Sequence, residues 1–132
     1  MIRLLYNLLF PVGLLFFLPG YLLKMRRRGN YRRNFGQRFG FYGAAVRARL
    51  AGQQTTWIHA VSVGEVAIGL KLAKRMRVLD SGFRCVLTTT TTTGFAVAAA
   101  EAVDWIEVMY QPLDFWPIVC RAFSVIQPAR IV

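Results

Sequence analysis

Acidic residues are scarce in this chain, and its first half has none. The 132 residues contain 6 Asp and Glu against 17 Lys and Arg, which gives a formal net charge of +11. Residues 1–64 hold ten of the bases and no acid, whereas residues 65–132 hold seven bases and all six acids. The positive charge therefore belongs to the first half, and we expect that half to face an anionic partner.

Cysteine and histidine are also scarce, since Cys85, Cys120 and His59 are the only residues of these types. They form no CxxC pair and no spacing typical of metal ligands, so neither a zinc site nor a disulfide scaffold is indicated. The GxGxxG and GxxxxGK[ST] fingerprints are absent, which leaves a dehydrogenase or a kinase without support. A hydrophobic fraction of 55% excludes a disordered basic tail.

One long apolar run is present near the start of the chain. Residues 4–23 contain 15 apolar side chains and no charge, which is about the length that crosses ~30 Å of hydrocarbon as a helix. Four bases, at Lys24 and residues 26–28, follow the run, in contrast to a cleavable signal peptide, where the charges come first. Because basic clusters remain on the cytoplasmic side, we expect the residues after the run to be cytoplasmic.

The same run contains four helix-breaking residues, Pro11, Gly13, Pro19 and Gly20. A spanning helix can accommodate them, but they also suit a kinked or re-entrant anchor. A third interpretation is a buried core helix, although a small domain could hardly cover a segment that is apolar on all faces. We favour a spanning membrane anchor over residues 1–23.

Residues 24–56 form a basic juxtamembrane segment in which arginine alternates with aromatic residues. Anionic lipid and nucleic acid both offer phosphate to arginine and a contact surface to aromatic rings. The position directly after an apolar anchor favours anionic lipid of the inner leaflet, and no nucleic-acid-binding signature accompanies the charge. A topology signal without any ligand would have the same composition. We expect the membrane as partner and no nucleic acid.

The remaining residues, 57–132, repeat a strand, a loop and a helix. A short apolar run at residues 57–61 precedes a helical pattern that opens at residues 62–65. In the second unit, a strand over residues 83–89 and a threonine-rich loop lead to an alanine-rich helix over residues 95–102.

The third unit has a strand over residues 106–110, a loop with Asp114 as helix N-cap and Pro117 in the first turn, and a helix that ends near Ile126. Residues 131–132 begin a fourth strand. This alternation predicts an α/β fold, with a parallel sheet and helices on its faces.

Ligands of such sheets bind outside the carboxyl ends of the strands. This rule places residues 62–65, 89–94 and 111–114 on one functional rim. Because the chain stops where a strand starts, we expect residues 57–132 to be an incomplete Rossmann-like domain.

Glu65 stands in the first turn of a predicted helix on this rim. Ser62 and Glu65 have the spacing of a capping box, in which Ser62 accepts from the helix start and Glu65 reaches back to the Ser62 N–H. The same carboxylate in a cleft could act as a general base, and Gly64 would let a substrate approach the backbone. Spacing alone favours the capping box.

Two other features of the rim have a structural and a functional interpretation. His59 has no Ser and Asp arrangement around it, so packing is favoured over catalysis. The six threonines at residues 88–93 suit a strand end, but with Gly94 they could present hydroxyls and helix-start N–H groups to a phosphate or a sugar.

Several segments, taken in order, resemble the 3-deoxy-D-manno-octulosonic acid (Kdo) transferases, which add Kdo to the lipid A precursor in Gram-negative bacteria. The most specific of them is residues 57–65, WIHAVSVGE. The others are the apolar amino terminus and residues 29–32 (GNYR), 37–40 (QRFG), 87–94, 111–114 (QPLD) and 127–128 (QP).

The resemblance implies the Rossmann-like amino-terminal half of a GT-B glycosyltransferase at the cytoplasmic face of the inner membrane. This half would handle the acceptor, the lipid A precursor lipid IVA, and a second domain would bind the donor CMP-Kdo. The family's catalytic base maps to Glu65, the reaction is inverting, and neither a metal ion nor another cofactor is implied. The expected substrate-binding residues are Ser62, Gly64, Thr90, Thr91, Gly94, Arg32 and Arg38.

The chain departs from the family pattern at two positions and in length. Thr92 stands where the family usually has proline, and Gln111 where it often has an apolar residue. The family continues beyond the strand begun at residues 131–132 with the rest of this domain and the donor-binding domain. We therefore expect an amino-terminal fragment that is inactive alone. The alternative is a non-catalytic membrane-anchored module that binds anionic lipid or glycolipid.

Overall fold

A four-stranded parallel sheet forms the centre of the computed structural model, which describes residues 2–27 and 34–132. The strand order is β3-β2-β1-β4, and every neighbouring pair is parallel. Because β2 and β3 lie on one side of β1 and β4 on the other, the winding reverses at β1, where ligands of such sheets bind. The strands are β1 (Thr55–Ala60), β2 (Cys85–Thr89), β3 (Ile106–Tyr110) and β4 (Pro128–Ile131).

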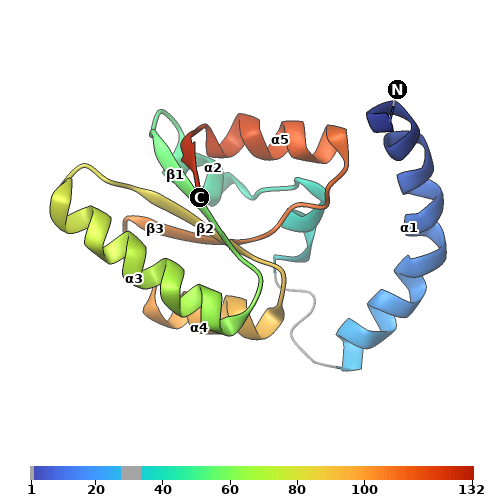
Figure 1. Ribbon diagram of the computed structural model, residues 1–132, viewed down its shortest axis with the longest axis horizontal. Helices are drawn as coiled ribbons and strands as arrows, with labels where there is room; N and C mark the ends of the chain where they lie inside the picture. The colour runs from blue at the N-terminus through green and yellow to red at the C-terminus, as the bar shows by residue number, and fades with distance from the viewer. Residues whose placement is uncertain (1, 28–33) are drawn as a thin grey trace.

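Helices cover both faces of the sheet. α3 (Val63–Leu79) and α4 (Thr92–Glu101) lie on one face, and α2 (Ala44–Leu50) and α5 (Trp116–Ile126) lie on the other (Figure 1). The long helix α1 (Ile2–Arg27) stands apart from both layers, beside the carboxyl ends of the strands (Figure 1). A short 3-10 helix, η1 (Phe35–Phe39), contacts β3.

The core consists of two layers, because alternate side chains of a strand point to opposite faces. Ile58 of β1 packs with Leu70 of α3 and Leu87 of β2. Trp57, the neighbour of Ile58, points to the other face and packs with Met109 and residues of α2 and α5. Side chains buried as completely as Leu70 and Leu87 each contribute roughly 1.5–3 kcal/mol to folding.

The predicted α/β class, the parallel sheet and the strand over residues 106–110 are confirmed. Two helix starts and the start of the fourth strand differ from the prediction, since β4 begins at Pro128 and not at residue 131. α4 begins at Thr92, not at residue 95, because the Thr91 side chain caps it by accepting a hydrogen bond from the Gly94 N–H. The N-cap of α5 is Phe115 and not Asp114, and no hydrogen bond from the N-cap side chain closes this end.

Part of the basic segment packs against the sheet. The Gln37 side-chain oxygen accepts a hydrogen bond of 3.0 Å from the Tyr110 N–H. Tyr42 and Leu50 are buried in the core layer that contains Trp57. The sequence predicted only a juxtamembrane role for residues 24–56, and that role stays a prediction, but residues 35–50 also belong to the folded domain.

Candidate active site

Glu65 lies at the start of α3, directly after the carboxyl end of β1. Its Oε2 accepts a hydrogen bond of 2.8 Å from the Val61 N–H, and its Oε1 accepts one of 3.1 Å from the Ser62 hydroxyl. These two bonds lower the pKa of Glu65 below its ordinary value of 4.5. The exposed carboxylate is therefore ionised at neutral pH, and each oxygen keeps a lone pair for a further proton donor.

The predicted capping box is present with one changed partner. The Ser62 hydroxyl accepts from the Glu65 N–H at 3.3 Å, as expected of an N-cap. The shortest bond to the Glu65 carboxylate comes from the Val61 N–H, one residue before the predicted donor, because the carboxylate reaches past Ser62. Capping thus fixes the orientation of the carboxylate and leaves it open to solvent.

The threonine run supplies the second part of the rim. The Thr90 hydroxyl donates a hydrogen bond of 3.2 Å to the Val61 carbonyl, which ties the loop after β2 to the loop after β1. The Thr91 hydroxyl accepts a bond of 3.0 Å from the Gly94 N–H. Gly94 is buried, and a Cβ added there would lie 2.6 Å from the Thr89 hydroxyl oxygen. Packing thus accounts for this glycine, and its predicted contact with substrate stays a prediction.

Arg38 brings a positive charge to the rim from η1. Its side chain is buried, its Nη2 donates a hydrogen bond of 2.7 Å to the Thr90 carbonyl, and its guanidinium carbon lies 4.2 Å from the centre of the Tyr110 ring. Burial lowers the pKa of Arg38 below its ordinary value, but arginine remains protonated in proteins. In the part of the chain that the structure describes, no carboxylate pairs with this cation and its Nε has no hydrogen-bond partner.

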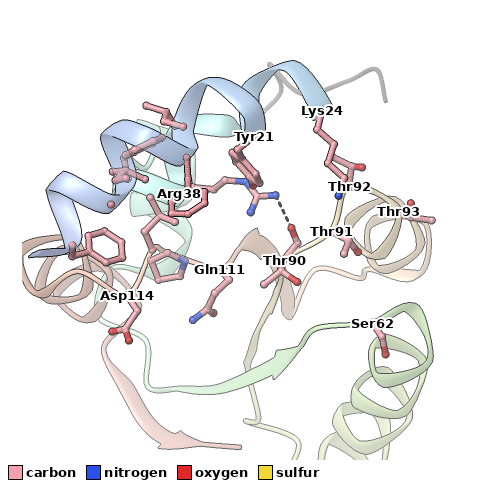
Figure 2. Close-up of a pocket in the computed structure, with 18 of the residues that line it drawn as sticks. Tyr21, Lys24, Arg38, Ser62, Thr90, Thr91, Thr92, Thr93, Gln111 and Asp114 are labelled. Carbon is pink, nitrogen blue, oxygen red and sulfur yellow. Dashed lines mark hydrogen bonds between the residues drawn. The ribbon is translucent and has the colours of Figure 1, made fainter. Parts of the chain in front are cut away.

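A pocket of about 1060 Å³ separates this rim from α1 (Figure 2). Its rim side includes polar residues, namely Arg38, Ser62, Thr90 and Thr91, beside the apolar Phe39, Val63, Pro112 and Leu113. Its other wall is the inner side of α1, which is apolar except near its end. That wall consists of Phe10, Gly13, Leu14, Phe17, Leu18, Tyr21 and Lys24. The pocket thus suits a molecule with a polar, anionic part and an apolar part.

Sequence comparisons identify the family. A family model described as 3-deoxy-D-manno-octulosonic-acid transferase (kdotransferase) matches residues 33–132. The chain belongs to the Kdo transferase family. The 3-deoxy-D-manno-octulosonic acid transferase of Chlamydophila psittaci is 34% identical over 124 residues, which are 93% of this chain and 27% of that protein.

Two further relatives bear the same name. The protein of Chlamydia pneumoniae is 28% identical over 129 residues, or 96% of this chain and 29% of its own length. That of Haemophilus influenzae is 33% identical over 98 residues, or 74% of this chain and 22% of its own length. The chain spans less than a third of each curated relative, and no solved structure matches.

The site residues predicted from the Kdo transferase resemblance fall into three groups. Ser62, Thr90, Thr91 and Arg38 line the pocket, and Gly64 and Glu65 follow Ser62 in the first turn of α3. Gly94 lies behind this surface. Arg32 lies outside the described residues. The roles of all these residues in substrate binding stay predictions.

A hydrogen-bonded group centred on Thr88 was missed from the sequence. The Thr88 hydroxyl accepts from the Trp57 Nε1–H at 2.8 Å and donates to the Gln111 side-chain oxygen at 3.1 Å. His59 Nδ1 lies 3.1 Å from the same hydroxyl oxygen, so His59 is held in place as well as packed. This group links the ends of β1, β2 and β3. Alternation along the strands places Trp57, His59 and Thr88 on one face of the sheet. Which of them form hydrogen bonds depends on the register between β1 and β2, which the sequence does not give.

Proposed function

We propose that this chain is the acceptor-side part of an inverting, metal-independent GT-B glycosyltransferase of lipopolysaccharide biosynthesis. The enzyme transfers Kdo from CMP-Kdo to a lipid A precursor, lipid IVA. It works at the cytoplasmic face of the inner membrane, against anionic lipid and without nucleic acid. Because the chain spans less than a third of its curated relatives, CMP-Kdo binding is assigned to residues outside these 132.

The observation that carries the proposal is the oriented, ionised carboxylate of Glu65 next to an amphiphilic pocket. In the proposed reaction Glu65 removes the proton from the acceptor hydroxyl. The oxygen then attacks the anomeric carbon of Kdo, and the bond from that carbon to the CMP phosphate breaks. A general base of this kind contributes about 10²–10⁴-fold to the rate.

The pocket supports a phosphorylated lipid as the acceptor. Arg38 is a buried cation, and Lys24 lines the same pocket. Arginine and lysine both form charge-assisted hydrogen bonds with phosphate groups. The apolar wall formed by α1 gives the acyl chains of the acceptor an apolar surface to contact in place of water.

The test is Glu65→Gln in the full-length enzyme that contains these residues. Glutamine keeps an oxygen that can accept from the Val61 N–H, so the fold should remain, whereas the base is lost. We expect kcat to fall by about 10²–10⁴-fold while acceptor binding persists. Glu101→Gln is the matched control, because Glu101 is an exposed acid paired with Lys74 and away from the pocket.

Full turnover by the Glu65→Gln enzyme would refute the role of Glu65 as the catalytic base. A separate assay on the 132-residue chain should detect no Kdo transfer. Transfer by that chain alone would refute the assignment of the donor site to other residues.

A further inference from the structure

The amino-terminal end of α1 is attached to the domain by polar contacts. The Tyr6 hydroxyl donates a hydrogen bond of 3.0 Å to the Asp114 carbonyl. The Asn7 side-chain oxygen accepts one of 3.0 Å from the Trp116 N–H, at the start of α5. The Phe115 N-cap offers this helix no side-chain cap, so Asn7 supplies the missing acceptor from another helix.

Aromatic packing accompanies these bonds. The Phe10 ring stacks on the Phe115 ring with a centroid distance of 5.4 Å and an interplanar angle of 7°. This end of α1 therefore contacts residues 114–116, where the loop after β3 leads into α5, through Tyr6, Asn7 and Phe10. Together, the two hydrogen bonds and the stacked ring pair fix the position of this end of α1 against the domain.

The other end of α1 contacts the same domain. The Arg38 guanidinium lies 6.0 Å from the centre of the Tyr21 ring, and Lys24 lines the pocket together with Thr92 (Figure 2). Half-exposed and pocket-lining residues recur at helical spacing between these ends, at Asn7, Phe10, Leu14, Leu18 and Tyr21. The inner side of α1 thus faces the rim along its length.

Contacts at both ends are incompatible with a helix that crosses the bilayer. Asn7 and Lys24 are about 26 Å apart along a helix with a rise of 1.5 Å per residue. This distance is close to the ~30 Å of the hydrocarbon core. If α1 crossed the membrane, one of these two residues would lie near the opposite surface. The α/β domain lies on one side of the membrane and could not contact that residue.

We propose that α1 lies in the plane of the membrane, within the leaflet that faces the domain, and does not cross it. Lipid covers the outer side of α1. α1 contains a 21-residue apolar stretch, Leu4–Lys24, with a mean hydropathy of 1.6 and no buried residue. Its outer side is strongly exposed and apolar, as at Leu4, Leu15 and Phe16, which are 76%, 76% and 78% exposed.

Charge and aromatic residues agree with this orientation. Lys24 ends the apolar stretch and lines the pocket, so a base lies where α1 meets the domain, as expected near anionic headgroups. Trp116, which is bonded to Asn7, is 68% exposed, and exposed tryptophan is typical of the membrane interface. The inner side of α1 can also be apolar, because it faces an amphiphilic pocket and not bulk water.

Cross-linking in membranes tests the orientation in the full chain. Tyr6→Cys with Asp114→Cys reports the amino-terminal contact, and Lys24→Cys with Thr92→Cys reports the other end, both in a Cys120→Ser background. With a short bifunctional thiol reagent we expect both pairs to cross-link. If only the pair at positions 24 and 92 reacts, the helix leaves the domain and the proposal fails.

An independent measurement uses a membrane-impermeant maleimide on sealed vesicles of known sidedness. In the Ile2→Cys, Cys120→Ser chain, position 2 should react from the same side as the exposed native Cys120 of the unaltered chain. Reaction from the opposite side would overturn the in-plane arrangement. Neither readout uses turnover, so these outcomes are separate from those that test the proposed reaction.

Discussion

Replacing Gly94 by alanine should destabilise the fold, although alanine is the better helix former. The added Cβ would lie 2.6 Å from the Thr89 hydroxyl oxygen, 2.8 Å from the Thr91 hydroxyl oxygen and 3.5 Å from a Val66 methyl. Thr89 is fully buried in β2, and Thr91 is the N-cap of α4. Neither hydroxyl can move without disturbing the strand or the cap.

The magnitude follows from three contributions. Overpacking a well-filled site costs about 1–3 kcal/mol. Weakening the Thr91 cap costs about 0.5–2 kcal/mol. The helix propensity of alanine offsets about 1 kcal/mol of this, so we expect a net loss of about 0.5–4 kcal/mol in the free energy of unfolding.

Gly64→Ala is the matched control, because Gly64 also lies in the first turn of a helix on the rim. A Cβ there would meet only the Ser62 hydroxyl oxygen, at 3.9 Å. Thermal unfolding should therefore show a lower Tm for Gly94→Ala, by about 2–8 °C per kcal/mol, and an unchanged or higher Tm for Gly64→Ala. Equal or raised Tm values in both variants would refute the packing argument.

Three further predictions concern the rim. Arg38→Lys should lower the free energy of unfolding in urea by about 1–2 kcal/mol, because lysine cannot both donate to the Thr90 carbonyl and stack over the Tyr110 ring; unchanged stability would contradict this. Thr88→Val should cost about 1–3 kcal/mol in the same assay, since the buried Trp57 Nε1–H loses its acceptor, and a neutral effect would point to a replacement partner. In the full-length enzyme, the acid limb of kcat/KM due to Glu65 should lie below pH 4.5, because a lowered pKa keeps the base ionised down to that pH; a limb due to Glu65 above pH 4.5 would count against this environment.

The fold could be predicted from the sequence where hydrophobic pattern and helix signals agree. Residues 106–110 lie between two loops, were predicted as a strand and form β3. The Ser62 and Glu65 spacing predicted the start of α3, because a capping box is a local device. The strand order was not predicted, because right-handed crossovers fix the face on which each helix packs and leave open which strands are neighbours.

The parts that could not be predicted depend on contacts between distant residues. Arg38 looked like one base in a juxtamembrane cluster, and its burial against Tyr110 needs the docking of η1 on β3. The α5 cap supplied by Asn7 joins residues 109 positions apart. Periodicity marks the inner side of α1, but it does not say which surface that side meets.

The first turns of α3 and α4 show why only one of these two loops can carry the proposed chemistry. Both begin with a hydroxyl N-cap that accepts from the N–H three residues later, Ser62 from Glu65 and Thr91 from Gly94. At that third position α3 has an exposed carboxylate, whereas α4 has a glycine enclosed by hydroxyl oxygens. The same backbone device therefore presents an ionised base in one loop and allows close packing in the other. A carboxylate at position 94 would have no room, so of these two loops only the one after β1, where the winding of the sheet reverses, can present the proposed base.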